Sequence, residues 1–162
     1  MVEISAKIIG AALPLLASLA YGRIKIRDLR RGLTEISAFL RLVRYIGDNV
    51  EHFMKPIPEI IAGFEDDYLE SVGFLQNARD SGLLSAWQGG SFLLSGEGKK
   101  ILDTYFTNVG GGYLDDEKKL TSYTEKRLEA LLESETVAAK DKERIYKTVP
   151  PMLAGSVVLI LI

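Results

Sequence analysis

Near each end of the chain lies a strongly apolar segment that contains no charged residue. Residues 8–21 read IIGAALPLLASLAY, and residues 149–162 read VPPMLAGSVVLILI. Each segment has about 14 residues, so as a helix it covers about 21 Å of a hydrocarbon core that is about 30 Å thick. Three arrangements fit such ends: a cleaved signal peptide with an apolar tail, two terminal helices packed on a soluble core, or a membrane hairpin.

Basic residues adjoin the inner side of each apolar end. They are Arg23, Lys25, Arg27, Arg30 and Arg31 after the first segment, and Lys140, Lys142, Arg144 and Lys147 before the second. Positive flanks stay on the cytoplasmic side of a membrane, so one topology satisfies both clusters, with the middle inside and both termini outside. A signal peptide instead carries its positive charge before the apolar stretch.

These charges favour the membrane hairpin over the other two arrangements. We therefore expect membrane spans at residues 1–22 and 149–162, with a cytoplasmic helical domain at residues 23–148 between them. Length alone leaves open whether residues 149–162 cross the bilayer completely, because Lys147, two positions before the segment, limits its extension.

The composition excludes several classes of function. The chain has 162 residues, which suits one domain, and its formal net charge is −2. A domain that coats nucleic acid carries a strong basic excess, so we expect no nucleic-acid partner. The chain has no cysteine and one histidine, which rules out disulfides, thiolate metal sites, thiol catalysis and multi-histidine metal sites.

Between the apolar ends, the pattern is helical. From residue 27 to residue 50 apolar residues recur every three or four positions, which predicts a helix with one buried face. We expect its charged residues to occupy the solvated faces; these are Arg30, Arg31, Glu35, Arg41, Arg44 and Asp48.

Further helices follow from capping and turn signals. Pro56-Ile57-Pro58 predicts a helix start, and a second helix runs from Leu69 through Ala78 to a left-handed cap near Gly82. Ser95 is a candidate N-cap for a helix over residues 97–108. The last long helix runs from Asp115 to about Lys147, with these residues facing inward: Leu120, Tyr123, Leu128, Leu131 and Leu132. No segment alternates at period two, so we expect an all-α, antiparallel helical bundle.

Several motifs resemble phosphate-binding, catalytic or metal-binding sites, but each one fits an ordinary structural role better. The run Gly96–Lys100 lacks the first glycine and the final hydroxyl of a phosphate-binding loop, so it predicts a helix start. Gly110–Gly112 reads as a flexible connection between helices. We expect His52, next to Glu51, to be an ordinary surface residue. The pairs Asp66-Asp67 and Asp115-Asp116 suit helix N-termini better than a divalent cation. We expect no enzyme activity, no cofactor and no metal.

The chain nevertheless resembles a known family. The features that carry the resemblance are the arginine-studded helix, the stretch RYIGDNVEHFMKPIPEI at residues 44–60, the single tryptophan, and the ending KERIYKTVPPMLAGSVVLILI. Together they are similar to stage III sporulation protein AB. Members usually have Leu-Gly, then Asp, then Gln before the last helix; here Gly112 and Asp115 match, whereas Gly111 and Lys119 replace the leucine and the glutamine.

The resemblance implies a location and partners. It implies a protein of the outer forespore membrane whose helical domain faces the mother-cell cytoplasm, and whose fold is similar to the cytoplasmic domains of type II secretion platform proteins. It also implies that the protein acts beside a secretion-type ATPase, stage III sporulation protein AA, and other subunits of the channel between mother cell and forespore. A homo-oligomer is compatible with this role. A platform component of a type II secretion or type IV pilus machine, and a soluble helical adaptor, are the alternatives.

Overall fold

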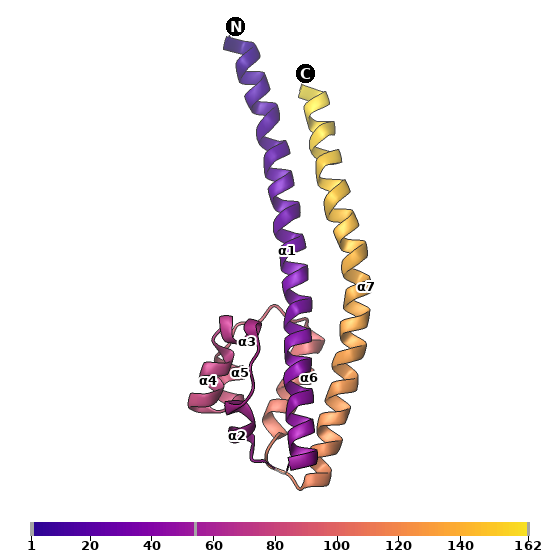
Figure 1. Ribbon diagram of the computed structural model, residues 1–162. Helices are drawn as coiled ribbons and strands as arrows, with labels where there is room; N and C mark the ends of the chain where they lie inside the picture. The colour runs from indigo at the N-terminus through magenta and orange to yellow at the C-terminus, as the bar shows by residue number, and fades with distance from the viewer. Residues whose placement is uncertain (1, 54, 162) are drawn as a thin grey trace. The chain divides into compact units, whose positions relative to one another are not determined.

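The computed structural model describes the backbone of residues 2–53 and 55–161, and the side chains of residues 16–52, 55–149 and 152. This part of the chain contains helices and no strand, which confirms the all-α prediction (Figure 1). The helices are α1 (Val2–Phe53), α2 (Ile57–Ala62), α3 (Asp67–Ser71), α4 (Phe74–Ser81), α5 (Leu83–Gly89), α6 (Gly96–Asn108) and α7 (Leu114–Leu161).

The helices divide into two compact units. Arg31–Glu135 form the first, which we call the bundle; residues up to Arg30 together with those from Thr136 onward form the second, the terminal unit. Both long helices, α1 and α7, contribute to each unit. The predicted boundaries after residues 22 and 148 refer to a membrane and remain a prediction.

The predicted membrane spans are only partly described. Most of residues 1–22 and 149–162 lie outside the residues whose side chains the structure describes. Among the residues that the structure describes, no helix combines the length and the apolar character that crossing a bilayer requires.

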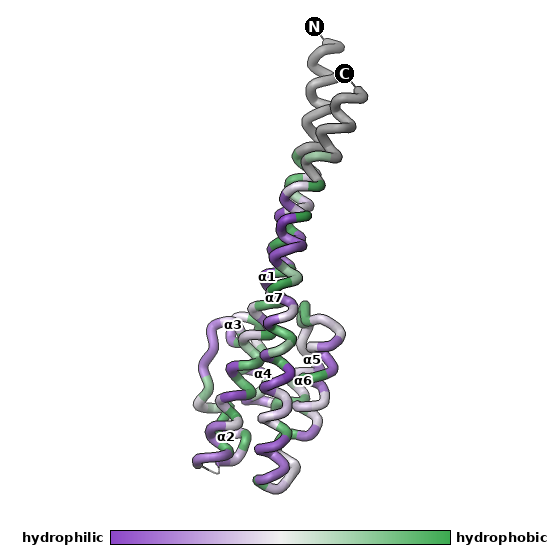
Figure 2. Tube along the Cα trace, turned by 90° about the vertical axis from the view of Figure 1, so that its right-hand side faces the viewer, coloured by the Kyte–Doolittle hydropathy of each residue, from purple (hydrophilic) through white to green (hydrophobic). Residues whose placement is uncertain are grey.

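The buried face of α1 is the centre of the bundle. Six of its apolar residues have no exposed surface: Ile36, Ala38, Phe39, Leu42, Val43 and Ile46. The ring of Phe39 lies within 6.0 Å, between centroids, of four other aromatic rings, which are Phe74, Trp87, Phe92 and Phe106. Hydrophobic and hydrophilic residues alternate along the helices of this unit (Figure 2), as an amphipathic helix packed on a core requires. The predicted one-sided helix is confirmed.

Local start signals are also confirmed. Helix α2 begins at Ile57, directly after Pro56. The Ser95 hydroxyl accepts a hydrogen bond from the Gly98 amide at 3.2 Å and caps α6, so the run Gly96–Lys100 is a helix start. The three acidic residues that follow Leu114 stand in the first turn of α7, where their charge favours the helix dipole.

One predicted helix is wrong. The segment from Leu69 to Ala78 forms two helices, α3 and α4, because Gly73 adopts a left-handed conformation with φ of 73° and interrupts the hydrogen-bond pattern. Gly82 ends α4 with φ of 87°, but its ψ of 161° places it outside the predicted left-handed helical cap.

Two predicted side-chain positions are also wrong. Tyr123 is 60% exposed rather than inward, and its ring lies 5.7 Å from the Arg127 guanidinium. The buried stripe of α7 passes instead through Thr121 and Thr124, which are nearly buried. Glu35, which we expected on a solvated face, has no exposed surface.

Candidate functional site

The basic residues of the terminal unit include an ion-pair cluster. Arg30 donates to both carboxylate oxygens of Glu143, at 2.7 Å from Nε and 3.2 Å from Nη2. Lys147 Nζ lies 3.5 Å from the same carboxylate. Accepting these hydrogen bonds lowers the pKa of Glu143, and donating them raises the pKa of Arg30. Thus Glu143 joins one member of each predicted basic cluster.

A close helix contact lies near this cluster. Gly22 of α1 is buried against α7, where an added Cβ would stand 2.7 Å from the Tyr146 carbonyl oxygen. The rings of Tyr21 and Tyr146 meet edge to face at 6.5 Å, and Lys25 Nζ lies 5.8 Å from the Tyr21 ring centre. The other basic residues predicted as membrane flanks in this unit are exposed: Arg23, Arg27, Lys140, Lys142 and Arg144.

Arg31 belongs to the bundle and contacts a buried carboxylate. Its Nε donates to the Tyr68 hydroxyl at 3.2 Å and lies 3.7 Å from Glu35. Glu35 accepts from the Tyr68 hydroxyl at 2.6 Å and from the Leu93 amide at 2.5 Å. Burial, followed by the hydrogen bond to Glu35, raises the pKa of Tyr68. This carboxylate therefore joins α1, α3 and the segment before α6.

Two further arginines of α1, Arg41 and Arg44, are paired as well as partly exposed. Arg41 donates to the Asp66 carboxylate at 2.8 and 2.6 Å, while Asp66 also caps α3 through the Tyr68 and Leu69 amides. Arg44 pairs with Glu125 at 2.7 Å and with Glu129. The expectation that these arginines are merely solvated is therefore incomplete, because they connect α1 to α3 and α7. Asp66, as predicted, serves a helix N-terminus.

The turn between α6 and α7 contains the family-like residues. Gly112, Asp115 and Lys119 are all exposed. The turn is organised by Glu117, only 7% exposed, whose Oε1 accepts from the amides of Gly110 at 2.8 Å and Gly112 at 3.0 Å. Sequence reasoning missed Glu117 as the residue that organises this turn. Its position a few residues after a glycine run is the signal that could have suggested this role.

An apolar groove lies beside this turn. Its volume is about 550 Å³, and its walls come from the end of α1, the start of α2 and the α6–α7 turn; they include Val50, Pro56, Ile57, Val109 and Leu114. Glu117 is the acidic residue of this lining.

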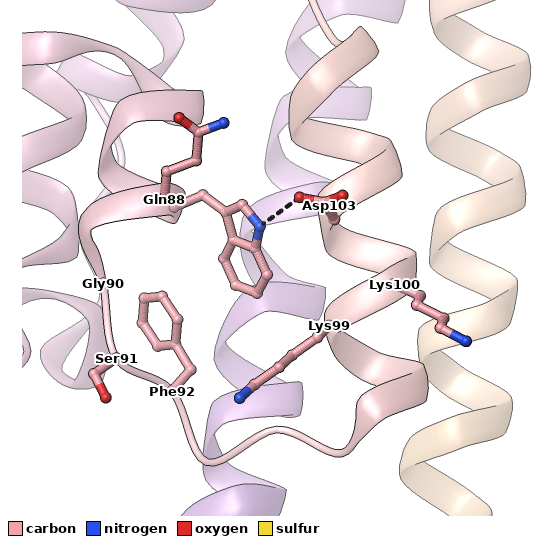
Figure 3. A pocket seen from close by; sticks show the side chains of 8 residues that line it. Gln88, Gly90, Ser91, Phe92, Lys99, Lys100 and Asp103 are labelled. Carbon is pink, nitrogen blue, oxygen red and sulfur yellow. Dashed lines mark hydrogen bonds between the residues drawn. The ribbon is translucent and has the colours of Figure 1, made fainter.

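A second pocket, of about 470 Å³, lies between α5 and the start of α6 (Figure 3). The rings of Trp87 and Phe92 stack in it, with centroids 5.1 Å apart and planes within 7°. Trp87 Nε1 donates to Asp103 Oδ1 at 3.3 Å. Lys99 extends toward the side of the pocket where Phe92 lies, whereas Lys100 points away from the rings (Figure 3). Sequence reasoning used the single tryptophan only for the family resemblance and did not predict this pocket.

The remaining predicted candidates stay apart from these pockets. His52 is exposed, with Nδ1 3.1 Å from the Asp48 carbonyl oxygen, and Glu51 pairs with Lys118 at 3.3 Å. Within the described residues, no group of three or more acidic or histidine side chains is placed to hold a metal ion. The absence of enzyme activity stays a prediction.

The chain was compared with protein families, curated proteins and solved structures. A family model described as stage III sporulation protein AB matches residues 7–162. No curated protein and no solved structure matches the chain, so the expected similarity to type II secretion platform domains also stays a prediction. Since the match covers nearly the whole chain, this protein belongs to the stage III sporulation protein AB family, which implies a role in sporulation.

Proposed function

We propose that this protein is a non-enzymatic membrane scaffold of the channel complex between mother cell and forespore. In this proposal the apolar ends anchor it in the outer forespore membrane. The bundle faces the mother-cell cytoplasm and docks the secretion-type ATPase, stage III sporulation protein AA, or neighbouring channel subunits. The observation that carries the proposal is the family match over residues 7–162.

The arrangement of the terminal unit supports a membrane anchor. The Gly22–Tyr146 contact pairs α1 with α7, so the basic residues that follow the first apolar segment lie beside those that precede the second. A cytoplasmic leaflet attracts each nearby lysine or arginine by about 1 kcal/mol. Five exposed basic residues on two adjacent helices therefore favour an anionic surface; these are Arg23, Arg27, Lys140, Lys142 and Arg144.

The construction of the bundle supports a docking role. Arg41 and Arg44 of α1 form ion pairs with Asp66 and Glu125. The buried Glu35 carboxylate accepts hydrogen bonds from Tyr68 and Leu93, which lie in two further segments. A surface fixed in this way loses little conformational entropy when a partner binds. It can therefore serve as a rigid support.

Membrane fractionation tests the anchor. We expect full-length protein from sporulating cells to stay in membranes after a high-salt wash and to be released by detergent, because apolar burial does not weaken with salt. A Lys140→Glu/Lys142→Glu variant should keep this behaviour, since the apolar ends remain. Release of the wild-type protein by salt alone would contradict the proposal.

The alternatives predict different observations. A run of sporulation genes beside this gene favours the channel complex, whereas secretion or pilus genes favour a platform component of those machines. A soluble adaptor would use both apolar ends in its core, so truncation to residues 23–148 should unfold it. Under our proposal that truncated chain stays folded.

A further inference from the structure

The apolar groove beside the α6–α7 turn lies where two connections of the bundle meet. The end of α1, the start of α2 and this turn come together at one end of the bundle (Figure 1). Most of the lining is apolar, and it includes Val50, Ile57, Val109 and Leu114. A volume of about 550 Å³ is within the range of sites that bind a ligand. The groove therefore has room for a few side chains of a partner.

The carboxylate of this lining is incompletely compensated. Glu117 is 7% exposed, and its Oε1 accepts from the Gly110 and Gly112 amides. Its Oε2 is enclosed and has no hydrogen-bond partner among the residues that the structure describes. Solvent screens a charge at this depth poorly, so a cation in the groove is attracted to Glu117 through the protein interior. This attraction leaves both amides bound to Oε1.

Lys55 and Lys118, both close to the groove, have acidic partners. Lys55 is part of the lining and pairs with Glu59 at 3.4 Å. Lys118, next to Glu117 in the sequence, pairs with Glu51 at 3.3 Å. Because a carboxylate matches each lysine, these two pairs leave the charge of Glu117 in excess.

The first turn of α7 adds further negative charge. Asp115 and Asp116 directly follow Leu114 of the lining and are exposed. Lys119, also exposed, stands four residues after Asp115 and offsets one of these charges. Together with Glu117, the turn therefore keeps an excess of negative charge beside the groove.

The occupant that fits both properties is a short segment with an arginine between apolar side chains. Its apolar side chains leave water when they pack against the groove, which favours binding. A guanidinium is more weakly hydrated than a lysine ammonium, so it is the cation better suited to a site that is largely apolar. The negative turn favours such a segment and disfavours an acidic one.

We propose that this groove docks a partner protein through a basic, apolar segment, with an arginine beside Glu117 and the flanking apolar side chains against Ile57 and Leu114. The inference rests on the proposed function and deepens it. It names the surface on which the scaffold receives another subunit, and the chemistry that this surface selects.

Two synthetic peptides test the groove on the full-length protein in a non-ionic detergent. One is acetyl-Ala-Leu-Arg-Leu-Ala-amide, and the other carries citrulline, an uncharged isostere of arginine, in place of the arginine. Binding is followed by NMR of protein labelled with ¹⁵N-glycine, because the Gly110 and Gly112 amides donate to Glu117. The amides of Gly73 and Gly82, which lie outside the lining, are the internal controls.

We expect both peptides to shift the Gly110 and Gly112 signals, and the arginine peptide to bind about tenfold more tightly than the citrulline peptide. Glu117→Gln keeps an oxygen that accepts from the two amides but removes the charge, so it should abolish this preference. Glu133→Gln is the matched control, since residue 133 is exposed on the same helix about 24 Å from Glu117. It should keep the tenfold preference.

Equal affinity of the two peptides for the wild-type protein would overturn the inference, as would equal shifts at Gly73 and Gly82 or a preference that survives in Glu117→Gln. Shifts of the Gly110 and Gly112 signals on dilution of the protein alone would overturn it too, because a second copy would then occupy the groove. The wild-type comparison needs no variant, so it decides the matter even where Glu117→Gln fails to fold. Release of the protein from membranes by salt would contradict the proposed function without changing the peptide preference, so the two failures are distinguishable.

Discussion

Gly47 of α1 and Thr121 of α7 touch so closely that a Cβ atom on residue 47 would lie 2.7 Å from Thr121 Cγ2. Thr121 is only 5% exposed, so its methyl group has little room to move. The absence of a side chain at Gly47 therefore sets how closely the two long helices approach in the bundle.

Gly47→Ala should consequently lower the free energy of unfolding by about 1–3 kcal/mol, because it overpacks this contact. Urea unfolding followed by circular dichroism measures the change. Thr121→Ser removes the obstructing methyl, so Gly47→Ala/Thr121→Ser should recover most of the loss. Gly96→Ala, where a Cβ meets no atom within 4 Å, is the control. If Gly47→Ala were as stable as Gly96→Ala, the contact would not be close in solution.

The buried carboxylate of Glu35 gives a second prediction. Glu35→Leu leaves the Tyr68 hydroxyl and the Leu93 amide without their acceptor. A buried donor without a partner costs about 1–3 kcal/mol, so we expect a loss of about 3 kcal/mol in the free energy of unfolding.

Two conservative variants separate the hydrogen bonds from the charge. Glu35→Gln keeps one acceptor oxygen and should cost less than Glu35→Leu, and Tyr68→Phe should cost about 1 kcal/mol. A Glu35→Leu protein with wild-type stability would show that the carboxylate does not hold these segments together.

Alkaline pH should destabilise the bundle through two tyrosines. Burial raises the pKa of Tyr105, which has no exposed surface, and the pKa of Tyr68 is raised as well. A raised pKa means that the folded state favours the neutral phenol. The stability contribution is therefore complete below the ordinary value of 10.0 and is lost as pH rises through the higher folded values.

The measurement is unfolding at a series of pH values from neutral to strongly alkaline. Tyr105→Phe keeps the ring and removes the titrating group, so its stability should fall less steeply at high pH while changing by no more than about 1 kcal/mol at neutral pH. Identical alkaline profiles for Tyr105→Phe and the wild type would exclude this tyrosine as a cause.

Pairing of the helices in the terminal unit depends on Gly22. Gly22→Val should separate α1 from α7 there, since the Tyr146 carbonyl oxygen leaves no space for a side chain. Amide hydrogen exchange in detergent should become faster in residues 16–30 and 137–149, while the protected core around Phe39 keeps its rate. Gly96→Ala again serves as control. Unchanged exchange in Gly22→Val would mean that this pair does not form.

Much of the fold was predictable from local signals. The apolar repeat of α1, the proline before α2 and the Ser95 cap each depend on residues a few positions apart. The break at Gly73 was not predictable in this way. Leu69, Val72 and Leu75 continue a helical spacing across it, and only the folded context places this glycine at positive φ.

The candidate sites were less predictable because their partners are distant in the sequence. The helical pattern of α1 places Glu35 among the surface residues. It is buried because the Leu93 amide, 58 positions later, donates a hydrogen bond to it. The pocket of Trp87 depends on Asp103 and on a ring folded over Gly90. Thr121 and Thr124 are polar but buried, whereas Tyr123 is exposed. A pattern that places only apolar residues in the core therefore assigned Tyr123 to the buried face by mistake.

Affinity isolation from detergent-solubilised membranes of sporulating cells tests the central claim most directly. The full-length protein should carry an affinity tag. Cells that produce the untagged protein are the control. A scaffold of the channel complex should bring down the secretion-type ATPase and other channel subunits in fixed proportion. Recovery of the protein from membranes without any of them, or from the soluble fraction, would contradict the account.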